Sequence, residues 1–146
     1  MQDSKAPFRR TARGSKRVST LGTVKEYIRR INAGDARGLG RLSSPYLKFI
    51  DATGARFRLT EDGWRAYFSD FPDYRIRVQQ ILSAGNTVAV FGFGSGSFKG
   101  RGSARGSAHW QFPAAWRAVV RAGKLVEWQV YCDVEPMLQS AGRGRF

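Results

Sequence analysis

The order of patterns along this 146-residue chain predicts an α+β fold, with about three N-terminal helices packed on a curved, mainly antiparallel sheet. Apolar residues first recur at helical spacing in the N-terminal half, and alternating apolar strands then follow to the C-terminal end. Short turn sequences, Gly85-Asn86 and Ala122-Gly123, separate those strands and indicate hairpins. A chain of this length fits one domain with a sizeable core.

Three helices are expected before the main run of strands. The first is marked by apolar residues at helical spacing and should begin near Ser19–Thr23 and end at Asn32-Ala33-Gly34. A short second helix is predicted over about 35–42, although two glycines weaken it. Thr60 should open the third helix, which ends before Pro72. Its apolar stripe consists of Trp64, Tyr67, Phe68 and Phe71, which we expect to form cavity wall and core.

One strand is predicted between the second and third helices, over 46–51, where Leu47, Phe49 and Asp51 share a face. Four more are expected over 74–82, 87–98, 109–120 and 124–133. The segment 92–106 holds six glycines and three basic residues and is predicted to be a mobile loop. It is not a P-loop, because the Gly-Lys-Ser/Thr ending and the following helix are both missing.

The last two predicted strands form a hairpin whose faces follow from its turn. If Arg121 pairs with Lys124, then Arg117 lies opposite Trp128. An arginine in the middle of a largely apolar face needs a partner, because a buried unpaired charge is very costly. The predicted face also carries His109 at its start, and the rest of it consists of Ala115, Val119, Val126, Val130 and Cys132.

The chain is strongly basic, with a formal net charge of +14. Residues 1–19 and 139–146 are predicted to be flexible basic tails around a domain at 20–138, because they lack a periodic apolar face. No apolar run reaches the length of a membrane helix, and no secretory signal is present, so a cytoplasmic location and no membrane contact are expected. Specific nucleic-acid binding is not favoured, because the basic segments contain few aromatic residues for base stacking.

Two segments resemble one known family. The run Val24-Lys-Glu-Tyr-Ile-Arg-Arg-Ile-Asn-Ala-Gly-Asp35 is similar to the opening helix of the SnoaL-like and ketosteroid isomerase-like branch of the nuclear transport factor 2-like superfamily. The closing segment, with Ala-Ala-Trp-Arg-Ala from residue 114 and Glu-Trp-Gln-Val-Tyr-Cys-Asp from residue 127, resembles the same branch. The resemblance covers about 20–138. It implies a cone-shaped fold that encloses one apolar cavity, and often a homodimer formed through the outer face of the sheet.

The resemblance also implies roles for single residues. Tyr27 stands where ketosteroid isomerases carry the tyrosine that donates to the substrate oxyanion. Asp51, sixteen residues after Asp35, stands where they carry the catalytic base. Their second acid would fall near Ala115, and limonene epoxide hydrolases place an acid at the position of Val130. Because neither position holds an acid here, the two best-understood activities of the fold are both disfavoured.

Arg117 is the distinctive candidate, and two interpretations stay open. It either pairs with Asp51 in a structural role or binds a carboxylate, phosphate or enolate oxygen of a ligand. In the second case Trp128 would stack on the flat part of that ligand. The remaining predicted wall of the ligand site consists of Leu47, Phe49, Trp64, Phe68, Ala115, Val119, Val130, Cys132 and, at the cavity mouth, His109.

The leading hypothesis is a small-molecule pocket protein that binds a partly apolar ligand with an acidic or enolisable oxygen. Its chemistry would be cofactor-free proton transfer of an isomerase, cyclase or hydrolase type, with Asp51 as base, Tyr27 as donor and Arg117 as electrostatic stabiliser. No metal is expected, because the chain contains a single histidine. The alternatives are a non-catalytic ligand-sensing or dimerisation module and an anion or nucleic-acid binder that uses the basic tails.

Overall fold

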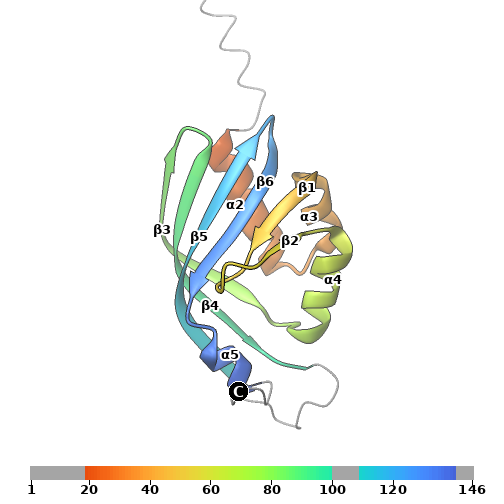
Figure 1. Ribbon diagram of the computed structural model, residues 1–146, viewed down its shortest axis with the longest axis vertical. Helices are drawn as coiled ribbons and strands as arrows, with labels where there is room; N and C mark the ends of the chain where they lie inside the picture. The colour runs from red at the N-terminus through yellow and green to blue at the C-terminus, as the bar shows by residue number, and fades with distance from the viewer. Residues whose placement is uncertain (1–18, 100–108, 141–146) are drawn as a thin grey trace, which may run out of the picture.

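A computed structural model describes residues 19–99 and 109–140 and confirms the α+β prediction. Three helices, α2 (Thr20–Asn32), α3 (Ala36–Leu42) and α4 (Glu61–Asp70), lie on one side of a bent six-stranded sheet (Figure 1). The strand order is β2-β1-β6-β5-β4-β3. Every described pair is antiparallel except β1 and β6, which run parallel. The strands are β1 (Ser43–Ile50), β2 (Arg56–Arg58), β3 (Arg75–Ala84), β4 (Thr87–Ser97), β5 (His109–Arg121) and β6 (Lys124–Cys132).

The three helices begin at the kinds of residue that the sequence indicated. Ser19, Asp35 and Thr60 cap α2, α3 and α4, and each side chain accepts a hydrogen bond from the backbone N–H three residues later. Asn32, at the end of α2, exchanges hydrogen bonds with the backbone N–H and carbonyl of Ile76 at 2.8 and 2.9 Å. The first helix is thereby held to the edge strand β3.

Two short elements were not predicted. Strand β2 has only three residues, all exposed, and is therefore too short for an alternation pattern to indicate. Helix α5 (Glu135–Ser140) follows the last strand, and Asp133 Oδ1 accepts from the backbone N–H of Glu135 at 3.0 Å before it begins. In Figure 1, α5 lies at the far end of the sheet from the β5–β6 turn.

The glycines of β4 form part of a regular strand, so for residues 92–97 the prediction of a mobile loop is wrong. Gly94 and Gly96 lie on the inner face, where the rings of β5 pack across them. A Cβ atom at Gly96 would lie 2.9 Å from the Trp110 ring, and one at Gly94 would lie 3.2 Å from Phe112. These positions are glycine because the aromatic residues of the neighbouring strand occupy the space of a side chain. Residues 100–106 of the predicted loop lie outside the described residues.

The register of the closing hairpin differs from the prediction by one residue. Arg121 pairs with Lys124 as expected, and Ala122 and Gly123 both have positive φ angles, 52° and 77°. A bulge at Val126 then shifts the ladder, so that Trp128 lies opposite Ala118 and Gln129 opposite Arg117. The prediction that Arg117 and Trp128 share a face is therefore wrong. The prediction extended a straight ladder from the turn, and such a ladder leaves no room for the extra residue of a bulge.

The core lies between the helices and the inner face of the sheet. Its largest fully buried side chains include Trp116, Trp128, Tyr27 and Leu39. Phe71, Trp110 and Phe112 form a second, smaller cluster. In the described part of the chain, no helix combines the length and the apolar character needed to cross a membrane. The predicted basic tails fall outside the described residues, except for Ser19, Gln139 and Ser140.

Candidate functional site

A cavity of about 410 Å³ lies between α4, the β1–β2 hairpin and the inner face of β5 and β6. Aromatic residues from four strands, one helix and a connecting segment line it. Five of the predicted ligand-binding residues, together with Asp51, line this cavity: Phe49, Trp64, Trp128, Val130 and Cys132. Its other aromatic residues are Phe57, Tyr67, Tyr74, Phe112 and Trp116.

The rings pack against one another and form a nearly continuous wall. Tyr67 and Tyr74 meet edge to face, with centroids 5.0 Å apart and planes at 86°. The Trp116 and Trp128 rings lie with their planes at 23° and their centroids 6.5 Å apart. Such an arrangement offers flat aromatic faces to a guest, and these faces stack best on another flat, apolar group.

Few polar side chains line the cavity, and besides Asp51 and Arg58 they include Tyr67, Tyr74 and Cys132. Burial raises the pKa of both tyrosine hydroxyls well above their ordinary value, and a hydrogen bond with the Trp116 indole offsets part of this rise at Tyr74. Burial likewise raises the pKa of the Cys132 thiol to about 11. At neutral pH all three groups therefore keep their protons.

Asp51 lines the cavity and also holds the turn between β1 and β2. Its Oδ1 atom accepts hydrogen bonds from the Thr53 backbone N–H, the Thr53 hydroxyl and the Ala55 N–H at 2.9, 2.7 and 3.0 Å. Desolvation raises the pKa of Asp51, but these hydrogen bonds together outweigh it and the pKa is lowered. The carboxylate is thus ionised at neutral pH, and it is a weaker base than the desolvated aspartate that the sequence suggested.

Tyr27 lies behind the cavity wall and does not line the cavity. Its side chain is fully buried, and its hydroxyl accepts a hydrogen bond from the Trp64 indole N–H at 2.9 Å. Burial raises the pKa of Tyr27, more than its hydrogen bonds with Trp64 and Ser43 lower it. In this structure Tyr27 positions the Trp64 ring, and Trp64 in turn faces the cavity.

Arg117 points to the outer face of the sheet, where it forms an ion pair with Glu127. Neither predicted interpretation of Arg117 holds, because Asp51 is not its partner and Arg117 does not line the cavity with Trp128. Both interpretations assumed that the charge of Arg117 needs a partner, and in the structure that partner is Glu127. The bulge at Val126 places the arginine and a carboxylate on the same face, where neither charge is buried alone.

Five more predicted site residues lie away from the cavity. Leu47 is fully buried in the main core, and Phe68 stacks on Trp64 at a centroid distance of 5.2 Å from outside the cavity wall. Ala115 and Val119 lie on the outer face with Arg117. His109 shares that face as predicted, but the face is not the one that lines the cavity. It is exposed, and its Nδ1 atom lies 3.0 Å from Ser97 Oγ and 3.7 Å from Asp73 Oδ2.

Sequence reasoning missed Tyr74 and Trp116 as ligand-site residues. The straight register assigned Trp116 to the opposite face. The opposite charges of Arg117 and Glu127 were the signal of a bulge, because only a bulge places both side chains on the same face. Tyr74 precedes the first residue of β3 and reaches the cavity from a connecting segment that follows Phe71. Its alternation with Ile76 placed Tyr74 in the predicted strand 74–82, and alternation alone does not show that its ring reaches a cavity.

Within residues 19–99 and 109–140, no three His, Cys, Asp or Glu side chains come close enough together to hold a metal ion. The described cavity is suited instead to a ligand held by stacking and by hydrogen bonds from neutral donors.

Comparison with known proteins places this geometry in a family. The model of the SnoaL-like domain matches residues 24–128, which is more than half of the chain. No curated protein matches the sequence significantly.

Several solved structures share the fold. A hypothetical protein with a ketosteroid isomerase-like fold from Catenulispora acidiphila, solved with trimethylamine, is 20% identical with a TM-score of 0.68 over 85% of this chain and 95% of its own. IdmH of Streptomyces antibioticus, a proposed polyketide cyclase, is 22% identical with a TM-score of 0.68 over 85% and 99%. An LEH-like epoxide hydrolase of M. tuberculosis is 17% identical with a TM-score of 0.69 over 86% and 90%. At these identities the similarity shows the fold alone.

Proposed function

The chain belongs to the SnoaL-like domain family, and from that premise we propose that it binds a flat, largely apolar small molecule with an enolisable oxygen and transfers a proton on it. The observation that carries the proposal is the aromatic cavity of about 410 Å³, whose wall holds protonated donors and the ionised Asp51. An apolar cavity with a few convergent polar groups is the usual form of a small-molecule site.

Stacking supplies the binding part of this proposal. Trp64, Trp116 and Trp128 all line the cavity, so a planar guest finds aromatic surface to stack on. The hydroxyl of Tyr74 is the proposed donor to the ligand oxygen. It takes over the role that the resemblance suggested for Tyr27, whose hydroxyl is buried behind Trp64.

Asp51 supplies the proposed base. Its Oδ1 atom is occupied by the turn, and its charge is retained at neutral pH, which leaves the carboxylate able to accept a proton from a carbon next to a carbonyl group. The electrons released would collect on the carbonyl oxygen, where a tyrosine hydroxyl stabilises them by donating a hydrogen bond. No cofactor takes part in this scheme.

The test uses α-tetralone, a flat bicyclic ketone with exchangeable protons next to its carbonyl group. We expect saturable binding by calorimetry, and exchange of those protons for deuterium in D₂O, followed by NMR, faster than without protein. Asp51→Asn should abolish the acceleration while binding persists, because the amide keeps the Oδ1 acceptor for the turn but has no basic oxygen.

Asp62→Asn is the matched control, since it removes an exposed carboxylate on α4 that pairs with Arg65 outside the cavity. Unchanged exchange in Asp51→Asn would remove the base from the proposal. Binding without any protein-dependent exchange would leave a non-catalytic ligand-sensing protein, which is the alternative that the sequence also allowed.

A homodimer is part of the proposal. Three large apolar side chains, Leu82, Phe91 and Tyr131, are exposed on the outer face of the sheet, and Phe91, Ala115 and Tyr131 stand in one cross-strand row. A second copy of the chain packed there would cover them. Phe91→Lys should then halve the molar mass in solution measured by light scattering, whereas an unchanged mass would contradict this interface. The cytoplasmic location stays a prediction.

A further inference from the structure

The charged groups around the aromatic cavity differ from those of the protein as a whole. Of the described residues that line the cavity, only Asp51 and Arg58 carry a formal charge at neutral pH. Asp51 directly follows β1, in which Phe49 pairs with Trp128 on the inner face of the sheet. The carboxylate therefore belongs to the same part of the wall as two of its aromatic residues.

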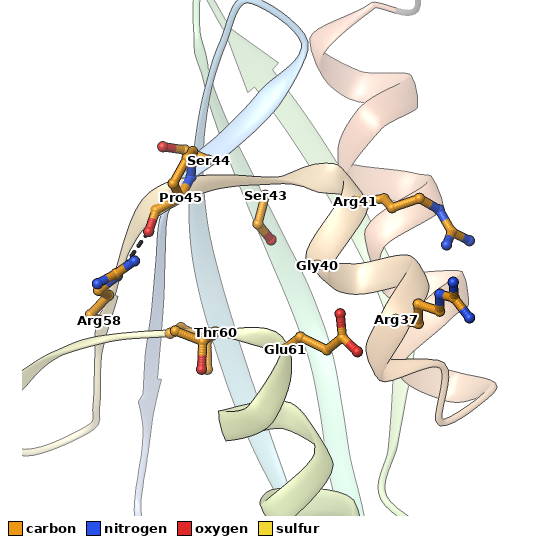
Figure 2. A pocket seen from close by; sticks show the side chains of 10 residues that line it. Arg37, Gly40, Arg41, Ser43, Ser44, Pro45, Arg58, Thr60 and Glu61 are labelled. Atoms are coloured by element: carbon orange, nitrogen blue, oxygen red, sulfur yellow. Dashed lines mark hydrogen bonds between the residues drawn. The ribbon is translucent and has the colours of Figure 1, made fainter.

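Arg58 borders the cavity, but its guanidinium group lies on the other face of the β1–β2 hairpin. Arg58 pairs with Lys48, whereas Phe49, the next residue along β1, lines the cavity, and successive side chains of a strand point to opposite faces. In the view of the open pocket beside α3, the Arg58 Nε atom donates to the Pro45 carbonyl at 2.8 Å (Figure 2). The guanidinium carbon also lies 5.2 Å from the centre of the exposed Tyr46 ring. This cation is thus held outside the cavity.

Two more carboxylates act on polar groups of the cavity wall. Burial is the main reason why the pKa of the Tyr67 hydroxyl is raised, and the negative charge of Asp70, at the end of α4, contributes to the rise. Burial likewise raises the pKa of the Cys132 thiol to about 11, and the charge of Asp133, directly after β6, adds to it. Together with Asp51, these groups place negative charge at the cavity from three separate elements.

No neighbouring basic group neutralises these three carboxylates. Over residues 19–99 and 109–140, no Lys, Arg or His side-chain nitrogen lies within 4.0 Å of a carboxylate oxygen of Asp51, Asp70 or Asp133. Basic side chains are nevertheless abundant, since the whole chain has a formal net charge of +14. The charge next to the cavity is therefore opposite in sign to the charge of the protein.

We propose that the cavity selects its flat guest by charge, so that it accepts neutral and cationic molecules and rejects anionic ones. This rests on the proposed function of the cavity and narrows its ligand to a carbonyl compound without a carboxylate or phosphate group. A carboxylate in a partly desolvated wall repels an anion and attracts a cation more strongly than it does in water. Aromatic faces also attract cations, whereas an anion in this cavity would lose its water without gaining a cationic partner.

The test compares three guests of one shape by calorimetric titration of the full chain at neutral pH and about 150 mM salt. They are 2-naphthylmethylammonium, 2-naphthalenemethanol and 2-naphthoate, whose single substituents are positive, neutral and negative. We expect saturable binding of the alcohol, binding of the ammonium compound at least as tight, and binding of naphthoate weaker than that of the alcohol by about tenfold or more. Any order in which naphthoate is not the weakest guest would overturn the proposal, and this result needs no mutation.

Asp51→Asn tests the source of the selection. It should reduce the ratio of the ammonium and naphthoate affinities by about tenfold and leave the affinity for the alcohol unchanged, because the amide keeps the shape of the side chain and loses its charge. Asp62→Asn is the matched control, with the same change of charge at an exposed carboxylate of α4. It should alter the ratio by less than about twofold. Equal effects of the two variants, or no effect of Asp51→Asn, would overturn the proposal.

Failure of this proposal can be distinguished from failure of the proposed function. If neither α-tetralone nor the alcohol binds, the cavity is not a site for flat apolar molecules, and the selection by charge falls with it. If both bind and the expected order of the charged guests is absent, only the selection by charge is wrong. Retained affinity for the alcohol in Asp51→Asn also shows that this variant is folded.

Discussion

The two faces of the β5–β6 hairpin differ more than any other pair of surfaces in this protein. On the inner face, Trp116 and Trp128 are each 2% exposed and form part of the cavity wall. On the outer face, Arg117 is 42% exposed and pairs with Glu127, and Tyr131 is 44% exposed. The same two strands thus supply an aromatic cavity wall on one side and an ion pair with apolar neighbours on the other.

The difference between the faces depends on one extra residue. Side chains alternate along a strand, so a shift of one position exchanges the two faces completely. The bulge at Val126 makes that shift after the first two pairs of the hairpin. It places Trp116 and Trp128 on the same inner face. It also places Arg117 and Glu127 on the same outer face, where they form an ion pair.

A deletion within β6 beyond the bulge should produce the largest effect, and deletion of the bulge residue itself is its control. Removing Val126 leaves the Ala118–Trp128 pairing in place and only straightens the ladder. Removing Gln129 turns Val130 outward and Tyr131 inward, and we expect a loss of more than about 4 kcal/mol in the free energy of unfolding. Urea denaturation compares the two variants. Equal losses would mean that the bulge does not set the faces.

Truncation of single side chains should show the same contrast on a smaller scale. Trp128→Ala removes a buried ring from the cavity wall and should cost about 3–5 kcal/mol of unfolding free energy. Tyr131→Ala, three residues later on the outer face, should cost less than about 1 kcal/mol in the monomer. Chemical denaturation measures both, and similar losses would contradict the assignment of the faces.

The ion pair on the outer face should contribute little. A double-mutant cycle with Arg117→Met and Glu127→Gln should give a coupling energy of about 0.5–1 kcal/mol, because the arginine is partly exposed and salt screens the pair. The coupling should fall at high salt. A value of several kcal/mol that salt leaves unchanged would indicate a buried pair, contrary to this structure.

The smallest expected effect concerns acid and the β1–β2 turn. The folded-state pKa of Asp51 is lowered, so its stabilisation is present above its ordinary value of about 3.9 and is lost as the pH falls through the folded-state pKa. Wild-type protein should therefore lose slightly more stability below about pH 4 than Asp51→Asn, which has no charge to lose. Identical acid profiles from thermal unfolding would show that the turn does not depend on this charge.

Much of the fold was predictable because its signals are local. Helix α4 was expected from the cap at Thr60 and the aromatic stripe that follows it, and the β5–β6 turn from Ala122-Gly123, whose two positive φ angles suit a tight hairpin. Both patterns involve residues that are close in sequence. Strand β2 left no such pattern, and it contributes to the cavity through Phe57 and Arg58.

The candidate site was only half predictable, for a different reason. Phe49, Asp51, Trp64 and Trp128 line the cavity as expected, since each lies in an element, or directly after one, whose position follows from family resemblance or regular spacing. Arg117 and Tyr27 do not, because their assignments depended on a straight ladder and on an unobstructed path from α2. The bulge places Arg117 on the outer face of the sheet, and the Trp64 ring lies between Tyr27 and the cavity.

The amino-acid sequence by itself determined the α+β class, the family, the order of the principal elements and the aromatic character of the interior. The tertiary structure alone decided which face of the closing hairpin lines the cavity, and that Phe57 of β2 lines it too. Secondary structure depends on contacts between near neighbours, which a sequence displays directly. The register of a ladder and the meeting of distant side chains depend on the packing of the whole chain, in which a single extra residue is sufficient to exchange inside and outside.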